Sequence, residues 1–533
     1  MSLLRGLMAS FLLASMACSP APTEEEITGG FAPVSYLASS PELLDLGKST
    51  YAKKCLPCHG EEGDGQGEAA YLLFPKPRNF VEAKYRLIST WETMPTDEDL
   101  FSTISRGMPG SAMPSWAHLP ERTRWGLLHY LKTFSRFPFQ LGPDHQPASA
   151  EDQPTGHVEI PPKPASTPET RAHARETYLE ICAGCHGDTG KGDGQEEQID
   201  SEGFPTSPRD LTVGIYKGRP DPEQVYYRIA AGLPGSPMPS HLALYGDDIW
   251  HLVDYVRNMS GETQRAKMEM KRFQIVAART EALPDHPDAS VWRDAPAFNL
   301  HLMPLWWRDD RPEEVTVQAL HDGNEIAIQL TWPDPTHDHT AIRPQDFRDA
   351  AAIELSRDMD PPFFGMGEQG FEVDIWMWKS ERQADLEPAF QELDKIYPNI
   401  GIDSYPNLLR SPLEQPTRNA LTLESDPDFV TGWGAGNIVS DPTRGTPAED
   451  LVAQGFGTLK ARPPVDQRVA ATGTYSLGSY RLVFRRALSG GRDRVSLQTG
   501  ETALVSFAVW NGSAGDRDGK KSVTIWQELY ISP

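Results

Sequence analysis

The sequence predicts a multidomain protein in which two small all-α domains precede a mainly-β sandwich domain. Its 533 residues are enough for three or four domains of about 150 residues each. A Cys-x-x-Cys-His segment occurs twice in the first half of the chain, at 55–59 and 182–186, inside a longer internal repeat. From about residue 285 onward, apolar and polar residues alternate as they do in half-buried strands.

Composition and charge indicate a soluble protein that does not bind nucleic acid. Hydrophobic residues make up 38% of the chain and charged residues 23%, which is typical of globular proteins and excludes a polytopic membrane protein. The formal net charge of −25 argues against a nucleic-acid partner, which needs a basic face, and suits a docking partner that carries positive charge. Five cysteines are too few for a disulfide scaffold, so their spacing carries the information.

The N-terminus has the features of an export signal. Residues 2–17 contain a positive charge at Arg5 and then an apolar stretch that is too short to span a bilayer. Cys18 follows small residues in a way that resembles the bacterial lipoprotein signal, in which the cleaved cysteine becomes the lipidated first residue. Leu is usual where Ser15 stands, so plain cleavage is the alternative. We expect a signal peptide at 1–17 and an exported, periplasmic protein anchored to the membrane by a lipid on Cys18.

The two Cys-x-x-Cys-His segments are typical of covalent haem attachment. In this motif, two thiols add to the vinyl groups of one haem, and the following histidine binds the iron. Half of a zinc site could account for one such match, but two matches within a repeat and behind an export signal favour haem. The sequence therefore predicts two haems c, held by Cys55, Cys58 and His59 and by Cys182, Cys185 and His186.

The internal repeat extends well beyond the two motifs. Corresponding pieces are Tyr51 and Tyr178, Pro77-Arg78-Asn79-Phe80 and Pro208-Arg209-Asp210-Leu211, GMPGSAMPSW from Gly107 and GLPGSPMPSH from Gly232, and RWGLLHYLKTF from Arg124 and IWHLVDYVRNM from Ile249. The last piece of each copy has apolar residues at helical spacing and predicts a closing helix. Arg78 and Arg209 either pair with haem propionates or lie exposed. The two stretches resemble class I cytochrome c domains, and we place them at 41–137 and 170–262.

The repeat also indicates the second axial ligand of each haem. Met113 and Met238 correspond, and each is followed by Pro-Ser, whereas Met108 corresponds to Leu233. Met-Pro in this loop is also the ligand motif of the resembled family, although such methionines can instead fill core space. We therefore expect His/Met ligation of both irons, which favours a high reduction potential and leaves no open position for a substrate.

Two connections join the predicted domains. Residues 138–169 are rich in proline, which predicts an extended linker that either wraps over both cytochrome domains or hangs free. Residues 263–284 contain basic residues and an apolar stripe with Phe273 and Val276, which predicts a connecting helix that ends near Pro284.

The last part of the chain, 285–533, predicts strands. Alternating runs begin at Val315, Asn324, Tyr480, Ala503 and Ser522. Asp322-Gly323, between the first two runs, is a hairpin signal. We expect a β-sandwich with inserted helices and long loops, including a loop excursion at 379–460, where no clear periodicity remains.

Several short motifs lie along this β-rich part. They are Gln318-Ala319-Leu320-His321-Asp322-Gly323, Leu330-Thr331-Trp332 with Asp334, Asp346-Phe347-Arg348-Asp349-Ala350, Gly365-Met366-Gly367, Ile375-Trp376-Met377-Trp378-Lys379, Phe507-Ala508-Val509-Trp510-Asn511-Gly512 and Gly519-Lys520-Lys521-Ser522. Together they resemble the γ subunit of ethylbenzene dehydrogenase, whose relatives include γ subunits of dimethylsulfide dehydrogenase and of selenate and chlorate reductases, and a nitrite oxidoreductase subunit. The resemblance implies a β-sandwich that holds one non-covalent haem b.

The resemblance also implies the ligands of that haem. The methionine of the Met-Gly motif corresponds to Met366, and the lysine of the Gly-x-Lys-Ser motif corresponds to Lys521, with Lys520 beside it. A lysine binds iron only when it is neutral, so burial and the metal must lower its pKa. Without a haem, Met366 would fill a core gap and the lysines would be solvated. The alternative ligands are His301, Met303 and Met377.

These features predict an exported, non-catalytic electron-transfer subunit with two haems c and one haem b. The ethylbenzene dehydrogenase resemblance implies a molybdopterin catalytic subunit and an iron–sulfur subunit of the dimethyl sulfoxide reductase family as partners. A soluble cytochrome or the respiratory chain would be the other redox partner. The four cysteines after Cys18 all belong to haem motifs, so none remains for an iron–sulfur cluster in this chain.

Two other functions would fit parts of the sequence. In the first, the β-domain lacks haem and binds a ligand or a carbohydrate, with stacking surfaces supplied by Trp306, Trp307, Trp376 and Trp378. In the second, the chain is a dihaem peroxidase. That activity needs an open iron position, and the paired Met113 and Met238 argue against it.

Overall fold

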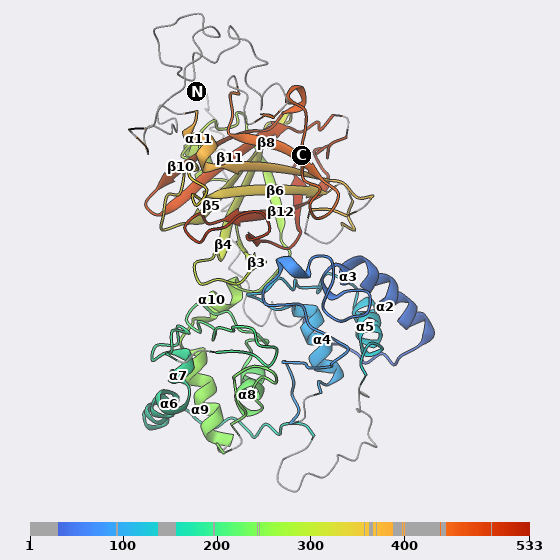
Figure 1. The fold of residues 1–533 in the computed structure, drawn as a ribbon, viewed down its shortest axis with the longest axis vertical. Helices are drawn as coiled ribbons and strands as arrows, with labels where there is room; N and C mark the ends of the chain where they lie inside the picture. The colour runs from blue at the N-terminus through green and yellow to red at the C-terminus, as the bar shows by residue number, and fades with distance from the viewer. Residues whose placement is uncertain are drawn as a thin grey trace, which may run out of the picture.

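The computed structural model arranges the chain as two helical domains and one β-domain. It describes residues 30–136 except 92–93, residues 156–386 except 196–197, 242, 245, 357, 362–365 and 369, and residues 444–533 except 492, together with 397, 399, 437 and 438. Figure 1 shows the β-domain at one end of the long axis and the two helical domains at the other end. Within these described ranges, no helix is long and apolar enough to cross a membrane. The predicted export signal and Cys18 lie outside them.

The first helical domain is built on two crossing helices. Helix α2 (Pro41–Lys54) begins after Ser40, whose side chain accepts a hydrogen bond from the Leu43 amide. It crosses the predicted closing helix, α5 (Glu121–Lys132), at Gly47 and Gly126. The crossing is close, because a Cβ on Gly47 would lie 2.0 Å from the Gly126 oxygen. The shorter helices of the domain are α3 (Leu56–His59), η1 (Ala70–Leu72) and α4 (Asp97–Arg106).

The second helical domain repeats this order, which confirms the all-α architecture expected for both copies. Its helices are α6 (Pro168–Ile181), α7 (Ala183–His186), α8 (Pro222–Ala230) and the predicted closing helix α9 (Gly246–Arg257). Each copy fixes its Cys-x-x-Cys-His turn in the same way. The Tyr51 hydroxyl donates to the Gly60 carbonyl at 2.7 Å, and the Tyr178 hydroxyl donates to the Gly187 carbonyl at 2.8 Å.

The described part of the proline-rich linker, from residue 156 onward, packs against both helical domains. The Val158 amide donates to the Ser89 carbonyl of the first domain at 2.9 Å. The Trp250 indole of the second domain donates to the Pro161 carbonyl at 2.8 Å. This half of the linker therefore bridges the two domains instead of hanging free.

The connection to the β-domain differs from the predicted helix over 263–284. Only α10 (Glu262–Lys267) is helical there, and β1 (Gln274–Arg279) is a strand. Ile275 and Ala277 are fully buried at alternate positions. Strand β1 pairs in parallel with the last strand of the chain on one side and with 319–321 on the other. The prediction was wrong for 274–279 because pairing with distant strands overrides a local helical pattern.

The β-domain confirms the mainly-β prediction, and the predicted runs fall on β4, β5, β11, β12 and the β13–β14 segment. Its strands after β1 are β2 (Ala297–His301), β3 (Met303–Pro304), β4 (Glu314–His321), β5 (Glu325–Pro333), β6 (Ala350–Ser356), β7 (Val373–Lys379), β8 (Ala448–Ala453), β9 (Lys460–Ala461), β10 (Ala470–Ser476), β11 (Ser479–Ala487), β12 (Thr502–Trp510), β13 (Ser522–Val523) and β14 (Gln527–Ile531). The short helices are η2 (Ser290–Arg293), α11 (Ser380–Ala384) and η6 (Pro464–Asp466). Part of the predicted loop excursion at 379–460 is therefore regular structure, since it contains α11 and β8.

The strands hydrogen-bond in one continuous path that folds back on itself. The order is β10-β11-β5-β4-β1-β14-β12-β6-β7-β8-β9, with β2 on β4 and β13 between β12 and β3. Trp332 on β5 and Trp378 on β7 are far apart in this path, yet their ring centroids lie 6.3 Å apart. Trp376 on β7 likewise contacts Phe484 on β11, at 6.4 Å. The two halves of the sheet therefore face each other as in a sandwich.

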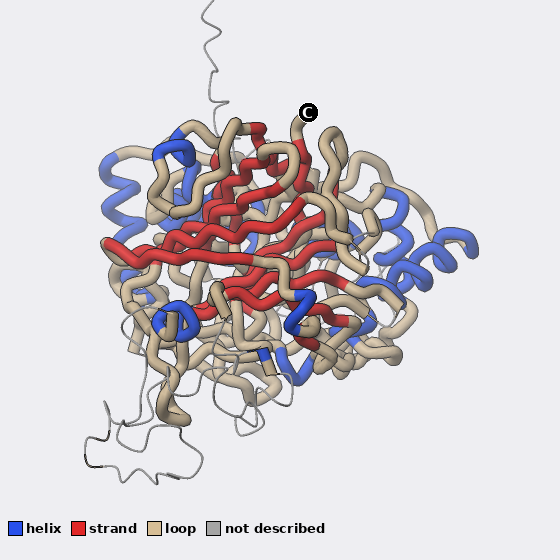
Figure 2. The backbone as a smooth tube through the Cα atoms, turned by 90° about the horizontal axis from the view of Figure 1, so that it is seen from above, coloured by secondary structure: helices blue, strands red, loops and turns tan. Residues whose placement is uncertain are grey.

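Figure 2 looks onto the β-domain and shows its strands running side by side across the centre of the view, with helices toward the edges. The main hydrophobic core lies between the two halves of the sheet and contains residues from nearly all of the long strands. The outer face of the β12-β6-β7 half points away from this core. A second hydrophobic cluster covers that face, and it includes Cys58, Ala69 and Leu73 of the first helical domain. The β-domain and the first helical domain therefore share buried apolar surface.

Candidate haem sites

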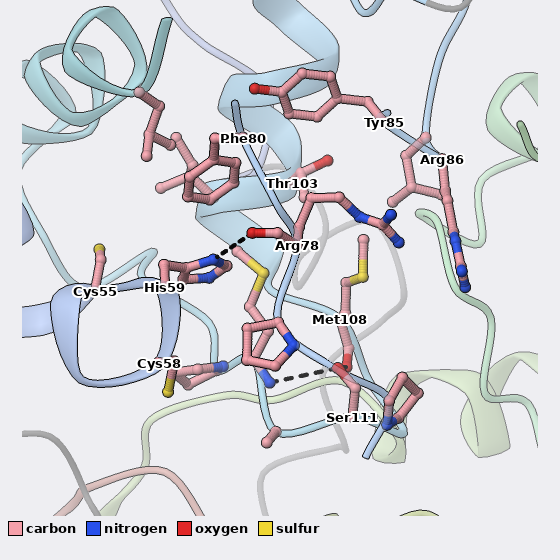
Figure 3. A pocket seen from close by; sticks show the side chains of 18 of the residues that line it. Cys55, Cys58, His59, Arg78, Phe80, Tyr85, Arg86, Thr103, Met108 and Ser111 are labelled. Atoms are coloured by element: carbon pink, nitrogen blue, oxygen red, sulfur yellow. Dashed lines mark hydrogen bonds between the residues drawn. The ribbon is translucent and has the colours of Figure 1, made fainter. Parts of the chain in front are cut away.

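The first helical domain encloses a cavity of about 160 Å³ whose wall contains Cys55, Cys58, His59 and Met113. Helix α3 holds Cys58 and His59, and Cys55 is its N-cap, so one helical turn supplies the thiols and the imidazole. The His59 Nδ1–H donates to the Arg78 carbonyl at 3.0 Å, as Figure 3 shows. This hydrogen bond fixes the ring and leaves Nε2 as the nitrogen that can bind a metal.

Burial keeps this site neutral. It lowers the pKa of His59 to about 4, so the imidazole is unprotonated at neutral pH. It raises the pKa of Cys55 and that of Cys58 to about 12, so both are thiols. Phe80 stacks on the His59 ring with centroids 4.4 Å apart. Two thiols and a neutral, oriented imidazole on the wall of one largely apolar cavity fit a covalently attached haem.

The second helical domain has an equivalent cavity of about 160 Å³, lined by Cys182, Cys185, His186 and Met238. Burial lowers the pKa of His186 and raises the pKa of Cys182 to about 11. A hydrogen bond with the Arg209 backbone, which corresponds to Arg78 in the first domain, acts in the opposite direction on the pKa of His186. The donor set is the same as in the first cavity, and it also fits a haem c.

The loops that hold the candidate methionine ligands have the same hydrogen bond in both copies. The Met108 amide donates to the Met113 carbonyl at 3.0 Å, and the Leu233 amide donates to the Met238 carbonyl at 3.1 Å. Both methionines of the first loop line their cavity, as do Leu233 and Met238 in the second. Met113 and Met238 therefore occupy corresponding places. We keep them as the proposed distal ligands.

The arginines of the repeat lie at the cavities. Figure 3 shows Arg78 and Arg86 close to Met108, on the side of the first cavity away from Cys55. Arg209 is 8% exposed and lines both cavities, which excludes the solvent-exposed alternative for this residue. Lys217 also lines both cavities. Sequence reasoning misses Lys217, because a single lysine outside any motif gives no signal.

The β-domain carries a third cavity of about 390 Å³ on the outer face of its sheet. Ala352 and Glu354 of β6 line the cavity, whereas Ile353 between them points into the sandwich core. Residues 71–73 of the first helical domain form part of its wall. Met366 and Lys521 both line this cavity, so the structure brings together the two residues that the family resemblance pairs.

A left-handed turn presents Met366 to the cavity. Its φ is 75°, and Gly367 follows with a φ of 77°. A Cβ on Gly367 would lie 2.7 Å from the Phe371 carbonyl, so this position requires glycine. The Met366 carbonyl accepts a hydrogen bond from the Gly455 amide at 2.8 Å. A non-glycine residue at positive φ, held in place by its surroundings, is typical of a functional position.

Lys521 lies at the cavity wall and Lys520 does not. Burial lowers the pKa of Lys521, although Glu354 acts in the opposite direction. The Lys521 ammonium lies 5.0 Å from the centroid of the Trp510 ring. Lys520 instead donates to the Ala514 carbonyl. A lysine with a lowered pKa in a mostly apolar cavity fits an amine ligand to iron.

Glu354 is a second ionisable group in the third cavity, and sequence reasoning misses it. Burial raises its pKa to about 7, and the Ser506 hydroxyl donates to one of its oxygens at 2.9 Å. A hydrogen bond from the Met366 backbone acts with the Ser506 hydroxyl against this rise in the pKa of Glu354. The sequence feature that could have indicated Glu354 is that it is the one acidic residue of a mostly apolar strand, Ala350–Ser356, and lies at an outward position of it.

Of the three alternative haem b ligands that the sequence offers, one lines the third cavity and two do not. Met377 lines the third cavity and is the alternative ligand within it. His301 and Met303 are buried but do not line it. Burial and Arg311 lower the pKa of His301 to about 3.

The four tryptophans considered for carbohydrate stacking do not form an open aromatic face. Trp376 and Trp378 are buried in the sandwich core. The Trp307 ring is in contact with the guanidinium groups of Arg209 and Arg311, which lie 4.0 and 3.8 Å from its centroid. Trp306 is partly exposed and packs against Phe74.

The sequence profiles of three known families match this chain. A profile described as cytochrome c oxidase, cbb3-type, subunit III matches residues 42–131, and one described as cytochrome c matches 172–260. A profile described as ethylbenzene dehydrogenase matches 289–522. These matches fall on the two helical domains and the β-domain.

Individual proteins are similar to parts of the chain. A Haloferax mediterranei protein that carries the assigned name of a respiratory nitrate reductase heme subunit is 24% identical over 269 residues, which are 49% of this chain and 72% of that protein. Dimethylsulfide dehydrogenase subunit gamma from Rhodovulum sulfidophilum is 33% identical over 106 residues, which are 18% of this chain and 40% of that protein. The match therefore spans less than half of the gamma subunit.

One solved structure is a chain of the reducing HAO-like protein complex of Kuenenia stuttgartiensis. It is 38% identical, and the similarity covers 41% of this chain and 96% of that chain, with a TM-score of 0.36. The family matches confirm both resemblances seen in the sequence. The chain therefore contains two cytochrome c domains followed by a domain of the ethylbenzene dehydrogenase family.

Proposed function

We propose that this chain is the exported electron-transfer subunit of a molybdopterin oxidoreductase complex and carries two haems c and one haem b. Three cavities with suitable donor groups support this number of haems. The assigned names of two relatives, a nitrate reductase heme subunit and a dimethylsulfide dehydrogenase gamma subunit, support the role in a complex. The haems would supply one-electron exchange between the ferric and ferrous states.

The observation that carries this proposal is the order of the three cavities. Leu73 lines both the first cytochrome cavity and the cavity of the β-domain. Arg209 and Lys217 line both cytochrome cavities. The cavity of the first cytochrome domain therefore lies between the cavity of the second cytochrome domain and the cavity of the β-domain. The order in space differs from the order in the sequence, where the second cytochrome domain is the one next to the β-domain. Such a row of adjoining cavities suits electron transfer through the subunit.

The ligand residues also argue against catalysis by this chain. With His59 and Met113 at one iron and His186 and Met238 at the other, neither haem c has a position for substrate. Lys521 and Met366 would hold the iron of the haem b in the β-domain. Substrate chemistry then belongs to a partner, for which we propose a molybdopterin catalytic subunit and an iron–sulfur subunit of the dimethyl sulfoxide reductase family.

The proposed route joins that complex to a second redox partner. Electrons would pass between the iron–sulfur subunit and the β-domain at one end of the row, and between the second cytochrome domain and a soluble cytochrome or the respiratory chain at the other end. A lipid on Cys18 would hold the chain at the periplasmic side of the membrane.

Purification from the native host tests the complex. A tagged chain should recover stoichiometric amounts of a molybdenum-containing subunit and an iron–sulfur subunit, both detectable by metal analysis and mass spectrometry. Recovery of the haem-loaded chain without molybdenum from gently lysed cells would contradict the proposed partnership. Replacing Cys18 with Ser should move the complex from the membrane fraction to the soluble fraction, and an unchanged distribution would contradict lipidation.

A further inference from the structure

Four cationic side chains converge between the two cytochrome cavities. A small space of about 40 Å³ between the cytochrome domains is lined by Arg78 and Arg86 of the first domain and by Arg209 and Lys217 of the second. Arg209 and Lys217 also line both cytochrome cavities. We call these four residues the interdomain cation cluster. The repeat in the sequence contains Arg78 and Arg209, but it does not predict that they come together with Arg86 and Lys217, because the cluster forms only when the domains dock.

The cluster holds more positive charge than nearby carboxylates neutralise. Arg86 pairs with Asp200 at 2.7 Å, and Arg78 pairs with Glu202 at 3.3 Å. Within the described part of the chain, neither Arg209 nor Lys217 has a carboxylate at ion-pair distance.

Arg209 is held by weaker contacts. It reaches across to the methionine loop of the first domain, where it approaches the carbonyls of Pro109 and Gly110 at 3.4 Å. Its guanidinium group also stacks on Trp307 at 4.0 Å. These contacts fix its position without neutralising its charge.

The unpaired charge has an electrostatic cost that an anion would remove. Burial and then the neighbouring Arg209 lower the pKa of Lys217 to about 7, with Arg86 and Arg78 acting in the same direction. Burial and then Arg311 lower the pKa of Arg209 to about 9. The chain as a whole carries a formal charge of −25, so this partly buried concentration of cations is opposite to its overall charge. A carboxylate bound in the interdomain cation cluster would form ion pairs with both Arg209 and Lys217.

We propose that the interdomain cation cluster is a shared counter-ion site that binds propionate carboxylates from both haems c, with Arg209 and Lys217 serving the two haems together. This inference rests on the presence of haem in both cytochrome cavities, which belongs to the proposed function. It extends that function, because a charge shared by two haems couples their reduction potentials. Arg78 and Arg209 are at corresponding positions of the repeat, yet only Arg209 lines both cytochrome cavities. The two arginines therefore have separate roles.

The direction of the effect follows from the charge of the iron. A nearby cation favours the reduced haem, which is less positive than the oxidised haem. Removing the Lys217 charge should therefore lower the midpoint potentials of both haems c. If Lys217 served one haem alone, a single potential would fall.

Redox titration of the full-length protein, with the two haems c resolved by their spectra, tests this inference. Lys217→Gln should lower both potentials, and Lys217→Arg, which keeps the charge, should leave both near the wild-type values. The matched control is Lys191→Gln, an exposed residue of the same domain that lines neither cavity. It should change neither potential. A shift confined to one haem, or no shift in Lys217→Gln, would overturn the shared site.

Two further measurements distinguish a failure of the shared site from a failure of the proposed function. A count of covalent haem in each variant must give two, and a lower count in the wild type would refute the proposed function itself. Titration of the wild type with added inorganic phosphate should leave both potentials unchanged, because the propionates already fill the site. A phosphate-dependent shift would show that the cluster binds a free anion and would overturn the assignment to propionates.

Discussion

Arg106 and Glu269 form a buried, bidentate ion pair where the three domains meet. The guanidinium Nη2 and Nε donate to the two carboxylate oxygens at 2.6 and 2.8 Å. The remaining nitrogen, Nη1, donates to the carbonyls of Tyr216 and Lys217 at 3.1 and 3.0 Å. Arg106 ends helix α4 of the first cytochrome domain, the carbonyls belong to the second, and Glu269 lies just before β1. One side chain of the first cytochrome domain therefore contacts both the second cytochrome domain and the segment that leads into the β-domain.

Replacing Glu269 with Gln should destabilise the protein strongly. The change leaves the Arg106 charge buried without a counter-ion, which costs about 3–5 kcal/mol in comparable cases. Urea unfolding should show the loss. The control is Lys163→Met, which breaks the pair with Asp254 on the surface and should cost less than about 1 kcal/mol. Equal effects of the two substitutions would contradict a special role for the buried pair.

Replacing Met113 should open one haem c iron, and replacing Met108 should not. Met113→Leu removes the proposed thioether ligand, so the reduced protein should bind carbon monoxide at one haem and lose one sulfur–iron absorption band. Met108→Leu installs the residue found at the corresponding position 233, and it should leave the band intact and bind no carbon monoxide. The reverse pattern would show that Met108 is the ligand.

Replacing Gly47 with Ala should weaken the crossing of α2 and α5. The added Cβ would lie 2.0 Å from the Gly126 oxygen, and a backbone atom cannot give way as a side chain can. We expect a loss of about 1–3 kcal/mol in unfolding free energy, as for other overpacked sites. Gly30→Ala is the control, because no atom lies within 4 Å of its new Cβ. A neutral effect of Gly47→Ala would contradict the close crossing.

Asp349 should make the stability of the β-domain depend on pH. Burial and then Asp334 raise the pKa of this carboxyl to about 7. The folded state therefore binds its proton more tightly than the unfolded state, and this stabilisation is lost as pH rises toward 7. Asp349→Asn cannot ionise, so the stability that it lacks relative to the wild type should shrink between about pH 5 and about pH 7.

The control for this pH effect is Asp322→Asn. Hydrogen bonds from the Glu325 and Asn324 backbones lower the pKa of Asp322, so it titrates below this interval. Its stability difference from the wild type should stay constant across the interval. A constant difference for Asp349→Asn as well would contradict the raised pKa of Asp349.

The features that the sequence predicts correctly are those with local signals. The repeated Cys-x-x-Cys-His turns of the two cytochrome c domains, the closing helices and the hairpin at Asp322-Gly323 each depend on spacing within a few residues. The Asp322 carboxylate does accept hydrogen bonds from the Asn324 and Glu325 amides, as this turn requires. The Met366 and Lys521 pair came from resemblance to a family, and the structure places both at one cavity.

The features that the sequence does not predict depend on distant contacts. Strand β1 forms because Ile275 and Ala277 pair with the last strand of the chain. Roles for Glu354 and Lys217 can be inferred only from the cavities that they line, and the sequence does not show these cavities. The contact of the third cavity with the first cytochrome domain, through Leu73, depends on domain docking, which leaves no periodic pattern in the sequence.

The most direct test of the three-haem electron-transfer subunit is a haem count before and after extraction with acidified acetone. The pyridine haemochrome spectrum should give three haems per chain before extraction. Two covalent haems c should remain afterwards, and one haem b should appear in the solvent. Met366→Ala should perturb the haem b spectrum or lose that haem, and leave both haems c unchanged. If the solvent removes no haem from the wild-type protein, the β-domain holds no haem b and the account is contradicted.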